Sequence, residues 1–226
     1  MKELLLFDID GTLIKVNHAG REAFCEALFS LFPDLMRGEF CFSLRGATDL
    51  GVFKAFCRQS GITFSQVLWE KFSFIFREAL KRASENYQWE VIPGAREMLN
   101  HCLNIGLSLG LATGNTREGS ILKLSSARFS LKDPAGGFGD DCLTKIEAVR
   151  KALLSFSSVA PDNILFFGDT HSDYQAACEC GISFTGIAGL DFQLKKYKYP
   201  FPVIEDYLSI LDAPDSPLYR EIFGES

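Results

Sequence analysis

The sequence predicts an α/β fold: a parallel sheet flanked by helices, with a small helical domain inserted after the first strand. Two observations lead to this class. Residues 15–88 carry apolar side chains at helical spacing, whereas from Val91 onward segments typical of strands and of helices alternate. Such alternation is typical of parallel sheets, whose strands are joined by right-handed crossovers. A chain of 226 residues has room for this core and a smaller insertion.

The first expected strand is the apolar run that begins at Leu4, and two carboxylates, Asp8 and Asp10, follow it directly. Side chains two residues apart point to the same face of a strand, so these carboxylates can converge on one point. Their repulsion is roughly 4 kcal/mol at about 4 Å and an effective dielectric of roughly 20. A bound divalent cation or one shared proton would relieve it. The alternative is a buried strand that ends in a polar turn.

The insertion is expected to contain three helices, because apolar residues follow the i, i+3, i+4 rule over residues 23–31, 52–57 and 67–80. Pro33 and Gly61 end the first two patterns, and the third ends near Asn86.

In the core, the expected strands after the first cover residues 107–112, 163–167 and 182–187. The expected helices cover residues 94–104, 145–156 and 172–180, and one more begins at Thr116. These patterns assign residues 1–14 and 89–226 to the core domain and residues 15–88 to the helical domain.

Composition argues against several function classes. The net charge of −6 and the absence of a basic block make nucleic-acid binding a poor expectation. The seven cysteines are an odd number and lie mostly in apolar segments, which is typical of a reducing compartment. The N-terminal apolar run is strand-length and ends in acid, so we expect neither a signal peptide nor a membrane span. A cytoplasmic monomer or homodimer is expected.

Polar motifs follow three of the expected strands: DIDGT at 8–12, ATGNT at 112–116 and GDTHSD at 168–173. In open parallel sheets ligands bind at the carboxyl ends of the strands, so these motifs are expected to meet in one crevice. Carboxylates, hydroxyls and helix N-termini together suit Mg²⁺ and a phosphate ester.

Each motif residue has an expected role in that chemistry. Asp8 is a plausible nucleophile, since carboxylates can form aspartyl-phosphates. Asp10 can protonate the leaving oxygen and then deprotonate water. Thr113 would bind a phosphoryl oxygen, Asp169 would bind the metal, and Asp173 would bind it or orient its water shell. The alternative for Thr113, Asp169 and Asp173 is helix capping.

In that order, and with a helical insertion after the first, DIDGTL, LATGNT and GDTHSD resemble the haloacid dehalogenase superfamily of hydrolases, mostly phosphatases. The resemblance runs from about Lys2 to Ile187. It implies a Rossmann-like core with a helical cap. It also implies that Asp8 is the nucleophile and a magnesium ligand, and that Asp10 is the acid-base residue whose backbone carbonyl contacts the metal.

The resemblance further implies that Thr113 binds phosphate and that Asp169 is a metal ligand, with Asp173 on the second acidic position of the last motif. The family also uses a basic residue to neutralise phosphate and nucleophile. Lys145 begins a helix after the glycine-rich GGFGDD loop, where some phosphoglycolate phosphatase-like members have such a residue. Lys132 is the rival, but the Asp-Pro that follows it favours a surface turn, so we predict Lys145.

Four residues are expected to contact the substrate. Gly114 and Asn115 follow Thr113, and Arg45 and Thr48 lie in a glycine-containing break between the cap helices. Arg45 can pair with a substrate carboxylate or a second phosphate. The alternative is a capped turn that starts the next helix.

The sequence therefore predicts a Mg²⁺-dependent phosphatase that hydrolyses a small phosphomonoester, phosphoglycolate-like or a phosphosugar, through an aspartyl-phosphate. The Asp at position 10 favours phosphate-ester chemistry over carbon–halogen cleavage, by resemblance. Two alternatives stay open: a phosphosugar mutase of the beta-phosphoglucomutase type, and a catalytically idle metal-binding interaction protein.

Overall fold

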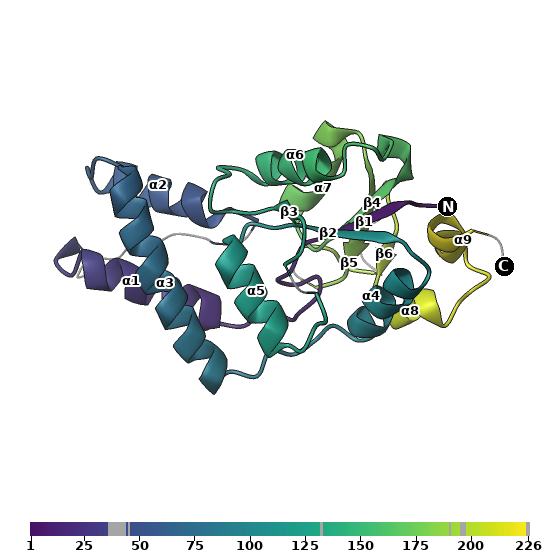
Figure 1. Cartoon of the computed structure of the whole chain (residues 1–226), viewed down its shortest axis with the longest axis horizontal. Helices are drawn as coiled ribbons and strands as arrows, with labels where there is room; N and C mark the ends of the chain where they lie inside the picture. Colours follow the sequence, from purple (N-terminus) through teal and green to yellow (C-terminus); the bar gives the residue numbers. More distant parts are fainter. Residues whose placement is uncertain (36–43, 45, 132, 190, 195–197, 225–226) are drawn as a thin grey trace.

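The computed structural model describes residues 1–35, 44, 46–131, 133–189, 191–194 and 198–224. These residues form a six-stranded parallel sheet in the order β3-β2-β1-β4-β5-β6 (Figure 1). Its strands are β1 (Leu4–Phe7), β2 (Ser108–Ala112), β3 (Gly136–Gly137), β4 (Ile164–Gly168), β5 (Ser183–Ile187) and β6 (Val203–Ile204). The predicted α/β fold is confirmed.

The central strand β1 is buried on both faces of the sheet. Leu4 and Leu6 belong to one hydrophobic cluster, and Leu5 and Phe7 belong to the other, because side chains alternate along a strand. Helices α6 (Lys145–Ser155) and α7 (His171–Cys180) cover the Leu4 side, and α4 (Ala95–Asn104) covers the Leu5 side. The sheet thus lies between two helical layers (Figure 1).

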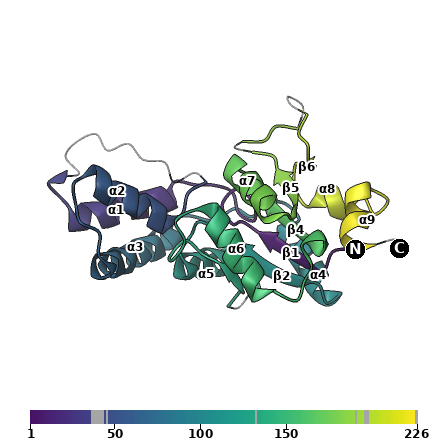
Figure 2. The same ribbon diagram turned by 90° about the horizontal axis from the view of Figure 1, so that it is seen from above.

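Between β1 and α4, the described residues form three α-helices: α1 (Ala19–Leu31), α2 (Asp49–Gln59) and α3 (Gln66–Asn86). They gather at one end of the molecule, away from the N-terminus and from α9 (Pro217–Phe223), as Figure 1 and Figure 2 show. Aromatic rings join them: the ring centroid of Phe72 lies 4.7 Å from that of Phe24 and 4.4 Å from that of Phe53. Their buried side chains are continuous with the Leu5 side of the sheet, and the exact domain boundaries stay predictions.

Threonine caps start the helices that follow the strands. Thr116 accepts a hydrogen bond from the backbone N–H of Gly119 at the start of α5 (Arg117–Ser126), and Thr144 caps α6 in the same way. At α7, Thr170 and Asp173 form a reciprocal capping box. These caps place the helix N-termini beside the carboxyl ends of the strands.

The expected helices and strands are present, with shifted ends: α2 begins at Asp49 and α7 at His171. The sequence did not predict β3, β6, the 3-10 turn Pro161–Asn163, α8 (Leu208–Leu211) or α9, because such short elements show no periodicity. In the part of the chain that the structure describes, every helix is too short or too polar to cross a membrane.

Candidate active site

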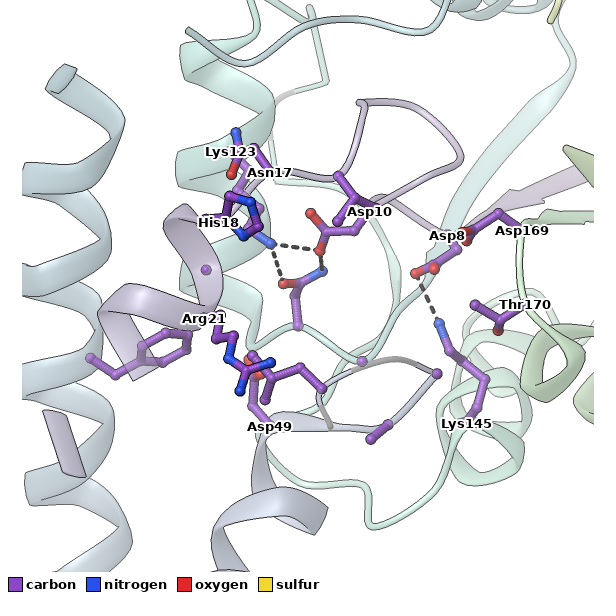
Figure 3. Close-up of a pocket in the computed structure, with 18 residues that line it drawn as sticks. Asp8, Asp10, Asn17, His18, Arg21, Asp49, Lys123, Lys145, Asp169 and Thr170 are labelled. Atoms are coloured by element: carbon purple, nitrogen blue, oxygen red, sulfur yellow. Dashed lines mark hydrogen bonds and ion pairs between the residues drawn. The ribbon is translucent and has the colours of Figure 1, made fainter. Parts of the chain in front are cut away.

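The three polar motifs meet at the carboxyl ends of β1, β2 and β4, which are neighbours in the sheet. A cavity of about 740 Å³ lies there, between the strand ends and the inserted helices (Figure 3). The core contributes Asp8, Asn115 and Asp169 to its wall, and the insertion contributes Leu44 and Phe76. The position agrees with the expectation for an open parallel sheet, because β1 is where the chain changes its direction of winding.

An acidic cluster forms the floor of this cavity. Oxygens of Asp8, Asp169 and Asp173 lie within 4.8 Å of one another, and the three residues are buried. Gly11 makes the cluster possible, since its φ of +82° turns the chain and a Cβ there would lie 2.1 Å from Oδ2 of Asp169. Three of the four carboxylates that the sequence predicts for the site thus lie together, and Asp10 is not part of this cluster.

The cluster strongly perturbs its own ionisation. Burial raises the pKa of Asp169 to about 9, and the neighbouring Asp8 and Asp173 add to the rise. Burial also raises the pKa of Asp8, to about 6, although Lys145 opposes the change. Carboxylates so disfavoured as anions are typical of a functional site.

The residues fit a magnesium ion. Oδ2 of Asp169 is buried and has no hydrogen-bond partner among the described residues, and buried polar atoms rarely remain so without a reason. Oδ2 of Asp173 accepts hydrogen bonds from the backbone N–H of Thr170 (3.0 Å) and from its hydroxyl (2.7 Å), which leaves only Oδ1 toward the cluster. Asp8 and Asp169 are therefore the better placed ligands, and oxygen ligands are what Mg²⁺ prefers.

Lys145 bridges two members of the cluster. Its Nζ lies 2.9 Å from Oδ1 of Asp8 and 2.9 Å from Oδ1 of Asp173, and 4% of the side chain is exposed. Burial alone would lower the pKa of Lys145, but the two carboxylates raise it above its usual value, so the lysine is a cation. The predicted lysine thus lies beside the predicted nucleophile, whereas Lys132 falls outside the described residues.

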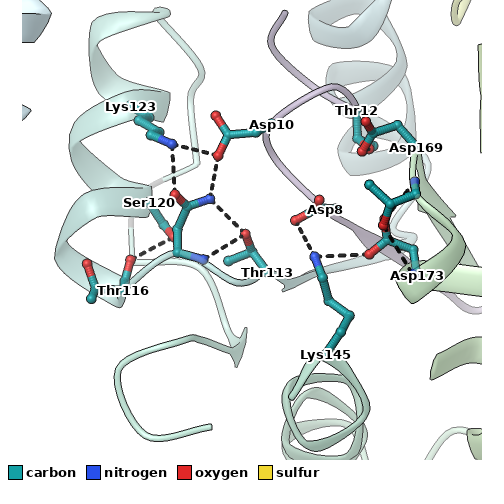
Figure 4. A network of polar contacts seen from close by, with 12 residues as sticks. Asp8, Asp10, Thr12, Thr113, Thr116, Ser120, Lys123, Lys145, Asp169 and Asp173 are labelled. Atoms are coloured by element: carbon teal, nitrogen blue, oxygen red, sulfur yellow. Dashed lines mark hydrogen bonds and ion pairs between the residues drawn. The ribbon is translucent and has the colours of Figure 1, made fainter. Parts of the chain in front are cut away.

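Asp10 points away from the acidic cluster and into a separate polar network (Figure 4). Lys123 donates to Oδ2 of Asp10 at 2.6 Å and to Oδ1 of Asn115 at 2.7 Å. Nδ2 of Asn115 donates to the same Asp10 oxygen (2.8 Å) and to the hydroxyl of Thr113 (2.9 Å). Loss of solvent would raise the pKa of Asp10, but Lys123 and then Asn115 bring it below its usual value. The predicted metal contact of its backbone carbonyl stays a prediction.

Sequence reasoning did not find Lys123. The residue lies on the buried face of α5, with Ser120, Leu124 and Ala127 at i−3, i+1 and i+4. The sequence does place this lysine on the apolar face of an amphipathic helix. Because lysine is almost never fully buried without a partner, that position indicates a buried ion pair.

The residues that lead into α2, 46–49, form the cap segment, which lies against the loop after β2. Asp49 donates its backbone N–H to the carbonyl oxygen of Gly114 (2.8 Å), and its carboxylate accepts from the backbone N–H of Thr116 (2.8 Å). Burial raises the pKa of Asp49 to about 7. Thr48, predicted to contact the substrate, is fully buried and caps α2 through the backbone N–H of Gly51; Asp49 lines the cavity instead.

Of the other predicted substrate contacts, Gly114 and Asn115 line the cavity, and Arg45 lies outside the described residues. Thr113 is buried at the end of β2, where its hydroxyl also accepts from the backbone N–H of Asn115 at 3.3 Å.

Comparison with known proteins identifies the family. A family model described as haloacid dehalogenase-like hydrolase matches residues 5–187. Solved structures with the same fold include a hydrolase from Pseudomonas syringae, with a TM-score of 0.71 and 21% identity over 95% of this chain and 98% of that one. CbbY from Rhodobacter sphaeroides, in complex with phosphate, has a TM-score of 0.71 and 18% identity over 93% and 96%.

A phosphonoacetaldehyde hydrolase-like protein from Oleispira antarctica has a TM-score of 0.64 and 17% identity over 100% of this chain and 95% of that one. No curated protein matches the chain. The family match covers the three strand-end motifs, and the structure places these motifs around one cavity. The chain therefore belongs to the haloacid dehalogenase-like hydrolases, and it is a hydrolase.

Proposed function

We propose that this hydrolase is a Mg²⁺-dependent phosphatase that acts on a small phosphorylated metabolite through an aspartyl-phosphate on Asp8. One observation carries the proposal: Asp8 lies at the floor of the cavity, where Lys145 holds one of its carboxylate oxygens at 2.9 Å. The other oxygen has no ion pair among the described residues. A buried carboxylate held in this way is suited to nucleophilic attack.

In the first half of the reaction, Oδ2 of Asp8 attacks the phosphorus atom, and the bond from phosphorus to the ester oxygen breaks. Lys145 offsets negative charge on the phosphoryl oxygens, and the hydroxyl of Thr113 donates a hydrogen bond to one of them. Asp10 takes up a proton when the anionic ester binds beside it, because a neighbouring negative charge disfavours the carboxylate. It then gives this proton to the departing oxygen, so that an alcohol leaves. The product is an acyl phosphate on Asp8.

In the second half, Asp10 takes a proton from water while the water oxygen attacks phosphorus. The acyl-phosphate bond breaks, which returns Asp8 as a carboxylate and releases inorganic phosphate. Asp8 and Asp169, with Asp173 beside them, would hold Mg²⁺, which supplies charge neutralisation for the phosphoryl group when bound.

The cavity supports a small substrate. Its volume of about 740 Å³ is within the range of small-molecule sites, and the inserted helices close its far side. CbbY, which shares the fold, has been crystallised with phosphate and with xylulose-(1,5)bisphosphate. A phosphate ester of a small metabolite is the ligand class that the site fits.

Phosphate release from a panel of small phosphate esters, with Mg²⁺ and with EDTA, tests this function. We expect Mg²⁺-dependent release from the wild type and from Asp215→Asn, a control on an exposed carboxylate, but only background release from Asp8→Asn. Acid-quenched wild-type protein should carry one phosphoryl group on Asp8 by mass spectrometry.

Near-normal turnover by Asp8→Asn would remove the proposed nucleophile. Release that EDTA leaves unchanged would remove the metal requirement. Retention of a bisphosphorylated product would identify a mutase, and a folded protein that hydrolyses no ester would favour an interaction protein.

A further inference from the structure

The cavity contains a second buried lysine, to which neither the motifs nor the proposed chemistry assigns a role. Lys123 projects from α5 toward Asp10 (Figure 3), and 5% of its side chain is exposed. Its Nζ lies 5.4 Å from the ring centroid of Trp89, and a Cβ at Gly20 would lie 3.6 Å from it. The surroundings therefore leave the ammonium group little solvent, so its polar contacts must come from the protein.

Those contacts converge on one oxygen of Asp10. Lys123 and Asn115 both donate to Oδ2 of Asp10, at 2.6 and 2.8 Å, and Lys123 also holds Asn115. Three side chains thus fix each other, so the carboxylate cannot rotate without losing two hydrogen bonds. Oδ1 of Asp10 has no hydrogen-bond partner in the described part of the chain, and 31% of the side chain is exposed, on the cavity wall.

We propose that Lys123 is a positioning residue that, together with Asn115, anchors Oδ2 of Asp10 so that Oδ1 faces the leaving oxygen of the phosphate ester. The inference rests on the proposed phosphatase function. Lys145 and Lys123 then act in the same way. Lys145 contacts one carboxylate oxygen of Asp8, and Lys123 contacts one of Asp10, so that the other oxygen of each carboxylate can take part in the reaction. Proton transfer needs a donor within hydrogen-bond reach, so a free Asp10 rotamer would slow it.

The competing role for Lys123 is direct binding of an anionic part of the substrate. The two roles differ in what they affect. A substrate-binding lysine changes KM for every ester with that anion, whereas a positioning lysine changes only those steps in which Asp10 moves a proton. A p-nitrophenyl ester separates them, because its leaving group departs without a proton.

The experiment compares Lys123→Met with Lys81→Met, an exposed lysine on α3 as the control. Two quantities are measured: the pre-steady-state burst of p-nitrophenol from p-nitrophenyl phosphate, and single-turnover cleavage of an alkyl phosphate. We expect Lys123→Met to lose about 100-fold in alkyl cleavage, as is typical when a general acid is impaired, with a burst rate within about threefold of the wild type. Lys81→Met should match the wild type in both.

A double-mutant cycle shows whether Lys123 acts through Asp10. In an Asp10→Asn background, Lys123→Met should change alkyl cleavage by less than about threefold, because residues that act as a unit are not additive. Three outcomes would overturn the proposal. The losses of the two single variants could multiply in the double variant, or Lys123→Met could lose as much in the burst rate as in alkyl cleavage. Lys123→Met could also raise KM while its rate of alkyl cleavage stays unchanged.

If Lys123→Met does not fold, Lys123→Gln decides, since it keeps a hydrogen-bond donor at this position and removes the ion pair with Asp10. It should show the same selective loss at a smaller size, and equal losses in both assays would overturn the proposal. Wild-type activity separates the two levels of inference. Absence of Mg²⁺-dependent cleavage of both esters by the wild type contradicts the phosphatase function itself, whereas wild-type cleavage with unselective variants contradicts only the role of Lys123.

Discussion

Two buried lysines divide the acidic groups of the site between them. Lys145 contacts Asp8 and Asp173 at the cavity floor, and Lys123 contacts Asp10 on the wall. Because Asp8 and Asp10 are each paired through one oxygen, the second oxygen of each keeps a defined direction. The two lysines therefore let two carboxylates of one motif, Asp8 and Asp10, take different roles, since a nucleophile and an acid-base group must face different atoms of the same ester.

Lys145→Ala tests the first of these pairs. The change leaves Asp8 and Asp173 buried without their cation, so we expect turnover to fall by about 100-fold or more, in the range for loss of a preorganised charge. Steady-state phosphate release measures the effect. Lys151→Ala, an exposed lysine on the same helix, should stay within about twofold of the wild type. A larger loss in Lys132→Ala than in Lys145→Ala would show that the wrong lysine was chosen.

At the scale of elements, what could be predicted from the sequence follows from periodicity. The strands that precede Asp8, Thr113 and Asp169 are apolar runs, so the polar residues that follow them are visible in the sequence. Lys123 has no such marker, because its burial depends on how α5 packs against the motif after β1. In the sequence, Asp49 has the features of a residue at the start of a helix. Its contact with the loop after β2 joins segments that are far apart in the chain, so it exists only in the folded protein.

That contact between the cap segment and the core leaves no room for a side chain at Gly114. A Cβ there would lie 1.9 Å from the carbonyl oxygen of Ala47, which is backbone and cannot rotate away. Gly114→Ala should therefore displace the cap segment, break the Asp49 contact, and reduce the free energy of unfolding by about 1–3 kcal/mol, as overpacking does. Urea denaturation measures this loss, and turnover should fall with it.

Gly189→Ala is the matched control, because a Cβ there meets nothing within 4 Å. Equal stability of the two variants would show that the cap segment accommodates the methyl group, and the close approach of cap and core would then have no energetic consequence.

For the whole molecule, buried carboxylates couple folding to pH and to metal. The pKa values of Asp8, Asp49 and Asp169 are about 6, 7 and 9, all above the usual 3.8. The folded chain therefore binds protons that the unfolded chain has released. Without a divalent cation, stability from these groups is fully present below about pH 4 and is lost as pH rises through 6 to 9. A cation that binds the ionised carboxylates opposes this loss.

We therefore expect the metal-free protein to have a lower Tm at pH 8.5 than at pH 6, and Mg²⁺ to raise the Tm more at pH 8.5 than at pH 6. Thermal unfolding followed by circular dichroism, with EDTA and with Mg²⁺, measures both. Asp169→Asn removes the group with the highest of these pKa values and a metal ligand, so it should flatten the metal-free decline between pH 7 and 9 and abolish most of the Mg²⁺ shift. A metal-free Tm that rises over this range, or a Mg²⁺ shift that is equal at both pH values, would contradict the coupling, because ionisation of the cluster must then cost the fold nothing.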